Sequence, residues 1–273
     1  MTGLFGVIGD PVSHSLSPLI HRGWIRDHGL DADYRGLQVP ADSLADAMET
    51  LLRQGVKGLN VTLPHKQAVM GHCDELSELA RSIGAVNTLS RLPSGGWRGD
   101  NTDHDGFIDD LSDVWGEPLR GRQVCILGAG GAARAVVLAL HGRGARLSIA
   151  NRTVERANAL VSELALADVQ VLALDAALSD LSGADLVVNC LSLGHSGGSL
   201  DWPAGNGRLL YDISYGRAAE QVLAPARQCG WQACDGLGML VAQAARSFAI
   251  WFGIEPDRSR AMARCRTALE AAG

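Results

Sequence analysis

The amino-acid sequence predicts two α/β domains, with the second inserted into the first. Two observations lead to this prediction. Strand-like apolar segments alternate with helical segments along most of the 273 residues, and two long helical segments follow the last strand-like one. Such alternation is typical of parallel strands joined by helical crossovers. Because the terminal helices have no sheet of their own to cover, we expect them to return to the first domain. The expected division is residues 1–104 with 237–273, around an inserted domain of residues 105–236.

The first hundred residues contain short apolar runs separated by amphipathic stretches and by turns rich in glycine and proline. We expect strands at Leu4–Ile8, Tyr34–Val39 and Gly58–Val61, and helices at Pro18–His28 and Asp42–Gln54. Two further strand-like runs flank Pro93-Ser94-Gly95 and are expected to form a terminal hairpin, Val86–Arg91 with Gly96–Gly99.

A second alternating series begins near Arg122. Its expected strands are Val124–Leu127, Arg146–Ala150, Leu186–Asn189 and Leu209–Ile213. Its expected helices are Ala132–Leu140, Glu155–Ala165 and Ala218–Gln228. The two terminal helices are expected at Met239–Phe252 and Arg258–Ala271.

The composition is that of a globular protein, with 47% hydrophobic and 20% charged residues. A net charge of −6 argues against nucleic acid as the main partner, because binding to phosphates needs a basic surface. The six cysteines are scattered without a C-x-x-C pair, so we expect neither a disulfide framework nor a metal site. No secretory signal and no run of membrane-spanning length is visible, which favours the cytoplasm.

A glycine-rich turn, Gly128-Ala129-Gly130-Gly131-Ala132-Ala133, follows an expected strand and opens an expected helix. This is the context of a dinucleotide-binding loop in a Rossmann-type domain, in which backbone N–H groups at the helix start hold the pyrophosphate. Gly128 would allow the tight turn, Gly130 the approach of the phosphates, and the small Ala133 the close packing of helix on strand. Such turns also occur for purely structural reasons.

The segment after the second strand of this domain predicts the cofactor. An enzyme that selects NAD usually has an acidic residue there, to bind the ribose hydroxyls. This chain has Asn151-Arg152-Thr153 followed by Arg156. Guanidinium groups match a phosphate, so the pair predicts NADP, which carries a 2′-phosphate. The alternative is that both arginines are solvated residues at a helix start.

Two short polar turns, each after an apolar run, contain a lysine and a carboxylate. They are Asn60-Val61-Thr62-Leu63-Pro64-His65-Lys66 and Asp100-Asn101-Thr102-Asp103. A lysine is ordinarily protonated at neutral pH, so Lys66 can donate a proton to a carbonyl oxygen while a nicotinamide delivers hydride to the carbon. Asp103 would orient the ammonium and bind a neighbouring hydroxyl. The alternatives are a solvated Lys66, and Asp103 as the N-cap of a helix that begins near Asp105.

These motifs, together with three others, resemble the shikimate dehydrogenase family in order and spacing, from Gly6 to about Phe252. The three others are Gly9-Asp10-Pro11-Val12-Ser13-His14-Ser15-Leu16-Ser17-Pro18, Gly84-Ala85-Val86-Asn87-Thr88 and Asp235-Gly236-Leu237-Gly238-Met239-Leu240. The resemblance implies reversible reduction of 3-dehydroshikimate to shikimate with NADPH, in the chorismate route to the aromatic amino acids.

The resemblance also implies roles for single residues. The catalytic pair would be Lys66 and Asp103. Substrate would be held by Ser15, Ser17, Thr62, Asn87, Tyr215 and Gln243. The cofactor would be held by Gly128, Ala129, Gly130, Gly131, Ala132, Asn151, Arg152, Thr153 and Arg156, with Ile213 and Gly236 near the nicotinamide.

The chemistry of the serines suits this substrate. The Ser15 and Ser17 hydroxyls, two residues apart in an extended turn, can both donate to one carboxylate. The sequence Ser-x-Ser-Pro before a helix is also an ordinary capping sequence, and Ser17 could serve both purposes. We interpret His14, His65, His104 and His195 as structural residues.

Two segments depart from the family pattern, Gly216–Gln221 and Cys190–Gly194, and both lie on the cofactor side. Competing functions remain open at the level of sequence. A quinate/shikimate or amino-shikimate dehydrogenase shares most of these motifs, although Arg152 argues against a strictly NAD-dependent quinate enzyme. A ligand-sensing relative without catalysis is a second alternative, against which the presence of Lys66 and Asp103 argues. A general two-domain NADP-binding protein is a third. The sequence is compatible with a monomer or a homodimer.

Overall fold

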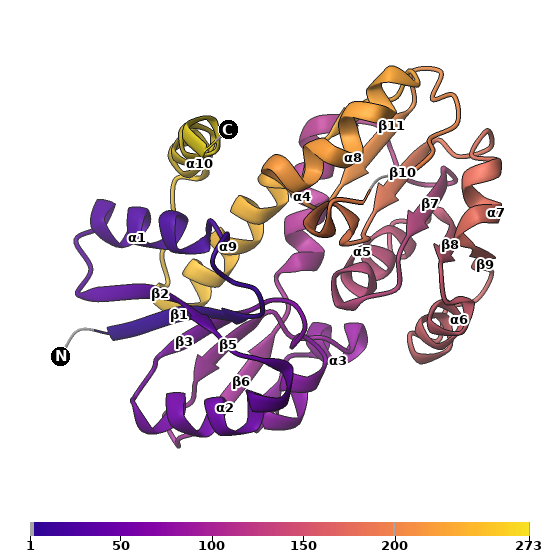
Figure 1. The fold of residues 1–273 in the computed structure, drawn as a ribbon. Coiled ribbons are helices and arrows are strands. Elements are labelled where there is room, and N and C mark those ends of the chain that lie inside the picture. Colours follow the sequence, from indigo (N-terminus) through magenta and orange to yellow (C-terminus); the bar gives the residue numbers. More distant parts are fainter. Residues whose placement is uncertain (1–2, 199, 273) are drawn as a thin grey trace. The chain divides into compact units, whose positions relative to one another are not determined.

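The computed structural model describes residues 3–198 and 200–272 and confirms the α/β fold class (Figure 1). The chain forms two compact units. The first unit is Met1–Gly106 together with Leu240–Gly273, and the second is Phe107–Met239. The predicted return of the C-terminal helices to the first part of the chain is therefore correct. Within the described residues, no helix is both long enough and apolar enough to cross a membrane.

The first unit contains a six-stranded sheet in the order β2-β1-β3-β5-β6-β4. Its strands are β1 (Gly3–Gly9), β2 (Ala32–Gln38), β3 (Gly58–Val61), β4 (Glu75–Leu76), β5 (Thr88–Arg91) and β6 (Trp97–Asp100). The first three are parallel to one another, as the helical crossovers predict. β5 is antiparallel to both β3 and β6, and the short turn between β5 and β6 permits only a hairpin there. The predicted hairpin is correct but is not terminal, since β4 extends the sheet beyond β6.

Helices cover both faces of this sheet. They are α1 (Ser17–Asp27), α2 (Leu44–Arg53), α3 (Glu78–Ile83), α9 (Leu237–Phe252) and α10 (Arg258–Ala272), with 3-10 turns η1 (Ala41–Ser43) and η2 (Ala68–His72). One face packs on α2, where Met48 and Leu51 join Leu59 of β3. On the other face, aromatic contacts join α1 and α9, for example between Trp24 and Phe248.

The second unit contains a fully parallel six-stranded sheet in the order β12-β11-β10-β7-β8-β9. Its strands are β7 (Gln123–Leu127), β8 (Arg146–Asn151), β9 (Gln170–Ala173), β10 (Leu186–Asn189), β11 (Leu209–Asp212) and β12 (Gln232–Cys234). Sequence reasoning missed β9 and β12, which are the two edge strands. Both are short and only partly buried. The apolar run of β9 continues directly into helix α7 (Leu174–Ser179), so its periodicity does not separate strand from helix, and β12 has only three residues.

Successive residues of these strands pack on opposite faces. Val124 and Ile126 lie in the core with residues of 103–115 and 131–141, whereas Cys125 and Leu127 lie in the core with residues of 174–179 and 216–228. The helices are α4 (Asp103–Trp115), α5 (Gly131–His141), α6 (Val154–Glu163), α7 (Leu174–Ser179) and α8 (Gly216–Gln228), with the 3-10 turn η3 (Leu193–Ser196). A doubly covered parallel sheet exposes its polar turns at the carboxyl ends of the strands, which is where ligands bind in such folds.

Candidate active site

Lys66 and Asp103 form a buried ion pair in the first unit. The Lys66 Nζ donates to the Asp103 Oδ2 at 2.7 Å, and the two side chains are only 14% and 5% exposed. Lys66 lies in the loop after β3, and its carbonyl accepts a hydrogen bond from the backbone of Val86 at 2.7 Å. The structure therefore brings together the two residues predicted to be catalytic, and Lys66 is not the solvated surface residue of the alternative interpretation.

Asn101, and not Asp103, caps helix α4. The helix begins at Asp103, two residues before the expected start near Asp105. The Asn101 Oδ1 accepts hydrogen bonds from the backbone N–H of Asp103 at 3.1 Å and of His104 at 3.4 Å. The alternative in which Asp103 is the N-cap is therefore wrong. Because Asn101 satisfies the helix start, the Asp103 carboxylate is available to Lys66 and to other partners.

Asn87 links the ion pair to α9. Its Nδ2 lies 2.8 Å from Asp103 Oδ1, 2.9 Å from Thr102 Oγ1 and 3.2 Å from Gln243 Oε1. The amide has only two N–H groups for these three acceptors, so it can donate to only two of them at one time. Gln243 reaches this position because α9 packs closely on α4, where a Cβ at Gly106 would lie 2.7 Å from the Gln243 backbone nitrogen.

Behind Asn87 lies a buried polar network that sequence reasoning missed. Asn60 Nδ2 donates to Ser247 Oγ at 2.9 Å, and its Oδ1 accepts from the Tyr34 hydroxyl at 2.7 Å. The Ser247 hydroxyl also lies 2.8 Å from that of Thr88 and 3.2 Å from that of Thr102. A polar residue in the middle of strand β3, such as Asn60, was the available signal, because a central strand buries its side chains on both faces.

Ser15 and Ser17 lie at the start of α1. The Ser15 Oγ accepts a hydrogen bond from the Ser17 backbone N–H at 3.2 Å. Ser17 is the first helical residue and is 5% exposed, whereas Leu16 occupies the N-cap position without a side-chain cap. The proposed capping role of Ser17 is therefore wrong, and its hydroxyl instead lies beside that of Tyr34. Burial raises the pKa of this tyrosine well above 10.

Thr62 follows β3, and its backbone N–H donates to the Ile8 carbonyl at 2.9 Å. Among the contacts of the described residues, no hydrogen bond joins Ser15, Ser17 or Thr62 to the Lys66–Asp103 pair. The serines and Thr62 therefore extend the polar surface at this end of the sheet without belonging to the ion pair.

The histidines near the ion pair have structural surroundings. His65 is 1% exposed, and its ring Nε2 lies 2.6 Å from the Val39 carbonyl oxygen, which anchors the loop that carries Lys66. His104 Nδ1 lies 2.7 Å from Asp105 Oδ1, and His14 is exposed. The side chain of His195 lies outside the described residues. In the part of the chain that the structure describes, no cluster of histidine, cysteine or acidic side chains could hold a metal ion.

In the second unit, the glycine loop joins β7 to α5 as predicted. Gly128 has a φ of +113°, and a Cβ there would lie 3.1 Å from the Cys190 backbone, so the turn itself requires glycine. Gly130 differs, because its φ is −90° and nothing in the described chain lies within 4 Å of a Cβ built there. No intramolecular contact explains Gly130. Gly131 begins α5, with Ala132 in its first turn, and the fully buried Ala133 packs the helix on the sheet.

The end of β8 carries two exposed arginines and no acid. The strand ends at Asn151, whose Nδ2 donates to the Thr153 carbonyl at 2.8 Å. Arg152, Thr153 and Arg156 are exposed. Within residues 3–198 and 200–272, neither guanidinium forms an ion pair with a carboxylate. Two unpaired cations at the carboxyl end of a strand are well placed to receive an anionic group.

A buried polar cluster at the ends of β10 and β11 was also missed. Asn189 Nδ2 donates to Asp212 Oδ2 at 2.7 Å, and the Ser214 N–H donates to Asp212 Oδ1 at 2.7 Å. Burial raises the pKa of Asp212. This cluster fixes the backbone at Ile213, which passes so close to Gly236 that a Cβ there would lie 2.8 Å from the Ile213 Cα. Tyr215, in the same segment, is the N-cap of α8 and is half-buried.

Comparison with known proteins relates these two units to one family. The shikimate dehydrogenase substrate binding domain matches residues 7–89, the shikimate/quinate 5-dehydrogenase model residues 111–196, and the shikimate 5′-dehydrogenase C-terminal domain residues 236–266. The shikimate dehydrogenase (NADP(+)) of Hyphomonas neptunium is 55% identical over 273 residues, which is 99% of each chain. The chain belongs to the shikimate dehydrogenase family.

Solved structures of shikimate dehydrogenases share its fold. The Thermus thermophilus enzyme in complex with NADP(H) and shikimate is 35% identical, covers 97% of this chain and 99% of its own, and has a TM-score of 0.83. A quinate dehydrogenase of Corynebacterium glutamicum in complex with NAD is 29% identical, with a TM-score of 0.85 over 97% of this chain and 99% of its own. The fold is therefore shared by dehydrogenases that differ in substrate and in cofactor.

Proposed function

We propose that this member of the shikimate dehydrogenase family is an NADP-dependent shikimate dehydrogenase, which reversibly reduces 3-dehydroshikimate to shikimate with NADPH. Its place would be the chorismate route to the aromatic amino acids. The observation that supports this most directly is the buried pair of Lys66 and Asp103 beside Asn87. This arrangement combines a proton donor with a hydrogen-bonding site for a polar ring, which is what reduction of a hydroxylated cyclic ketone requires.

In the reductive direction, Lys66 would donate a proton to the ketone oxygen, and bound NADPH would supply the hydride. Asp103 keeps the ammonium in one position through the 2.7 Å contact, which reduces the entropy lost when the substrate is aligned. The second carboxylate oxygen of Asp103 accepts from Asn87 at 2.8 Å, so the carboxylate is held from two sides. A ring hydroxyl beside the ketone can then donate to Asp103, and it can accept an Asn87 N–H in place of Thr102 or Gln243.

The substrate-binding residues would lie around this pair. Ser15 and Ser17 would bind the carboxylate of the substrate, and Thr62 and Asn87 would bind the ring hydroxyls. Tyr215 and Gln243 are the other two residues that we expect to hold the substrate. The Ser15 Oγ accepts the backbone N–H of Ser17, which leaves the Ser15 O–H able to donate to a ligand. The half-buried Ser15 is accessible to a ligand, whereas Ser17 lies deeper in the same turn.

The second unit suits NADP. A glycine at position 130 is not required by the chain itself, which is expected where a diphosphate approaches the backbone at the start of α5. The exposed Arg152 and Arg156 at the end of β8 would bind the 2′-phosphate. The cofactor-binding residues would be Gly128, Ala129, Gly130, Gly131, Ala132, Asn151, Arg152, Thr153 and Arg156, with Ile213 and Gly236 near the nicotinamide.

On this proposal, residues 1–104 with 237–273 form the substrate domain and residues 105–236 form the NADP domain, a division that lies within three residues of the two compact units. We further propose that the enzyme acts in the cytoplasm as a monomer or homodimer.

The test of function is the appearance of NADPH absorbance when purified protein is mixed with NADP and shikimate. Saturable NADPH formation supports the proposal, and its absence from folded protein would refute it.

A further inference from the structure

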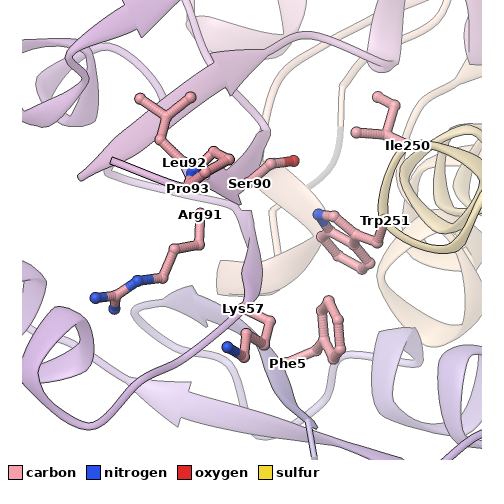
Figure 2. Close-up of a pocket in the computed structure, with 8 residues that line it drawn as sticks. All are labelled: Phe5, Lys57, Ser90, Arg91, Leu92, Pro93, Ile250 and Trp251. Carbon is pink, nitrogen blue, oxygen red and sulfur yellow. The ribbon is translucent and has the colours of Figure 1, made fainter. Parts of the chain in front are cut away.

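The hollow of about 510 Å³ in the first unit does not form one site for a small ligand. Figure 2 shows the rings of Phe5 and Trp251 on the side of the sheet that α9 covers. The head groups of Lys57 and Arg91 point to the other side, where Arg91 reaches the end of α2. A carboxylate with an unusual set of partners lies instead in the second unit, on the half-buried Asp110 of α4.

Asp110 binds the first turn of α9 from another helix. Its Oδ2 accepts a hydrogen bond from the Met239 N–H at 2.9 Å, which is one of the N–H groups that a helix start leaves without a partner. Its other oxygen, Oδ1, lies against Gly238, where a Cβ would overlap with it. The carboxylate therefore contacts two successive residues of α9, and it can approach so closely because residue 238 has no side chain.

Tyr211 of β11 holds this carboxylate in position. Its hydroxyl donates to the Asp110 Oδ2 at 2.5 Å. The fully buried tyrosine ring packs edge-on against Phe107, three residues before Asp110 on α4, with the ring centroids 5.3 Å apart. Both the ring and the hydroxyl of Tyr211 thus bind α4, and the place of Asp110 against the first turn of α9 is fixed.

The contact lies at one end of a short segment that begins with Gly236, which we expect near the nicotinamide. At the start of this segment, the Gly236 N–H donates to the Ser214 carbonyl at 2.8 Å. Ser214 is in turn bound through its own N–H to the buried Asp212 at 2.7 Å. The backbone at Gly236 is therefore held from one side by Asp212 and, two to three residues later, from the other side by Asp110.

We propose that Asp110 is a positioning residue for the nicotinamide half of NADP, and that it acts through the first turn of α9 on the backbone at Gly236. The inference rests on the proposed function, which places the nicotinamide near Gly236. Hydride transfer depends steeply on the alignment of the reacting atoms, so a small displacement of this backbone lowers turnover. The residues proposed to bind the phosphates lie in other turns, after β7 and β8, and their binding should not change.

The role of Asp110 is that of a hydrogen-bond acceptor, because one oxygen, Oδ2, receives both the Tyr211 hydroxyl and the Met239 N–H. An asparagine can present a single acceptor oxygen in the same place. Asp110→Asn should therefore retain the positioning, whereas alanine should not. Asp110→Ala is combined with Tyr211→Phe, because the tyrosine hydroxyl would otherwise be buried without a partner.

The test compares the binding of NADPH with that of adenosine 2′,5′-bisphosphate, which carries the 2′-phosphate but has no nicotinamide. Calorimetry gives both dissociation constants, and absorbance gives kcat for the oxidation of shikimate. Asp113→Ala, the same loss of charge at an exposed position of α4, is the matched control. Gly238→Ala displaces the Asp110 carboxylate without removing it, and it carries the same prediction if the double variant does not fold.

We expect the double variant and Gly238→Ala to bind NADPH about fivefold more weakly and to lower kcat by about tenfold or more. Their affinity for the bisphosphate should stay within about twofold of the wild type, and Asp110→Asn should stay within about threefold in each measurement. Asp113→Ala should behave as the wild type.

Unchanged kcat in both the double variant and Gly238→Ala would overturn the proposal. So would an equal loss of affinity for the two ligands, or a loss in Asp110→Asn as large as in the double variant. Failure of the proposed function is distinguishable from these results, because it appears in the wild type. A wild-type protein that binds NADPH without oxidising shikimate refutes that function, and the two affinities then decide the role of Asp110.

Discussion

At the scale of single residues, the central feature is that one ion pair is shielded from water. An exposed lysine–carboxylate pair contributes little and is mobile, whereas Lys66 and Asp103 are held by Asn87 and by the Val86 contact to the Lys66 carbonyl. The role of each side chain can therefore be tested by removing one functional group at a time.

Replacing Lys66 should separate catalysis from binding. Lys66→Ala should lower kcat by roughly two to four orders of magnitude, the usual scale for a positioned acid–base group, and should raise the KM for shikimate far less. Steady-state kinetics in both directions measures this. The matched control is Lys57→Ala, which removes the other lysine of the chain. A Lys66→Ala enzyme with near-normal kcat would remove Lys66 from the mechanism.

Arg152 should decide between the two nicotinamide cofactors. Arg152→Asp would repel a 2′-phosphate and offer an acceptor to a ribose hydroxyl, so the preference for NADP over NAD should fall by on the order of tenfold to a hundredfold. The ratio of kcat/KM for the two cofactors is the measurement. Added salt should weaken the wild-type preference, because both arginines are exposed. An unchanged ratio in the variant would mean that the arginines are only solvated surface residues.

At the scale of secondary-structure elements, the loop from β7 to α5 contains two glycines, Gly128 and Gly130, whose replacement by alanine should have different effects. Gly130→Ala should leave thermal stability nearly unchanged, since its φ and surroundings accept a Cβ, but should raise the KM for NADP by about tenfold or more. Gly128→Ala should instead destabilise the protein by more than about 1 kcal/mol, because φ is +113° there. Thermal melts with and without NADP distinguish the two outcomes. Equal NADP affinity in Gly130→Ala would contradict the proposed contact.

How far the sequence predicts the elements depends on burial. Central strands such as β7 and β10 are buried except for Gln123 at the start of β7, and they appear as continuous apolar runs. The edge strands β12 and β4 are too short for such a run, and the run of β9 continues into α7, so all three were missed. The start of α4 was misplaced because Asp103 is itself a common N-cap residue, whereas in the structure the Asn101 side chain binds the first N–H groups of the helix. Only the three-dimensional position of Lys66 shows that the Asp103 carboxylate is used elsewhere.

The site was predicted to a similar degree. The residues in recognisable motifs were found, whereas the polar network behind them was not, because Ser247 and Tyr34 lie outside the motifs and meet Asn60 only in the fold. Similarly, Asp212 was missed because an aspartate at a strand end is ordinary until the structure shows it buried against Asn189.

At the scale of the whole molecule, one buried histidine should make stability depend on pH. His21 is fully buried and stacks on Tyr34, with ring centroids 4.3 Å apart. Burial lowers its pKa from 6.5 to about 3, although Asn60 opposes this in part. The unfolded chain therefore binds a proton that the folded chain does not, so the free energy of unfolding falls as pH drops from about 6.5 towards 3.

The contribution of His21 should be about 1.4 kcal/mol for each pH unit in this window. His21→Phe keeps an aromatic ring and removes the titration, so its unfolding free energy should fall less on acidification than that of the wild type. Urea unfolding at pH 7 and pH 5.5 measures the difference. Asp110 and Asp212, whose pKa values burial raises, contribute with the opposite sign in both proteins and cancel in this difference. Parallel pH dependence of the two proteins would contradict this assignment.

The central claim, that the whole molecule is an NADP-dependent shikimate dehydrogenase, is tested most directly by one comparison. Values of kcat/KM are measured for the oxidation of shikimate and of quinate, each with NADP and with NAD, on the same purified protein. We predict that shikimate with NADP is the most efficient combination, by on the order of a hundredfold over NAD. Equal efficiency with NAD, or preference for quinate, would contradict the assignment and favour the quinate/shikimate alternative.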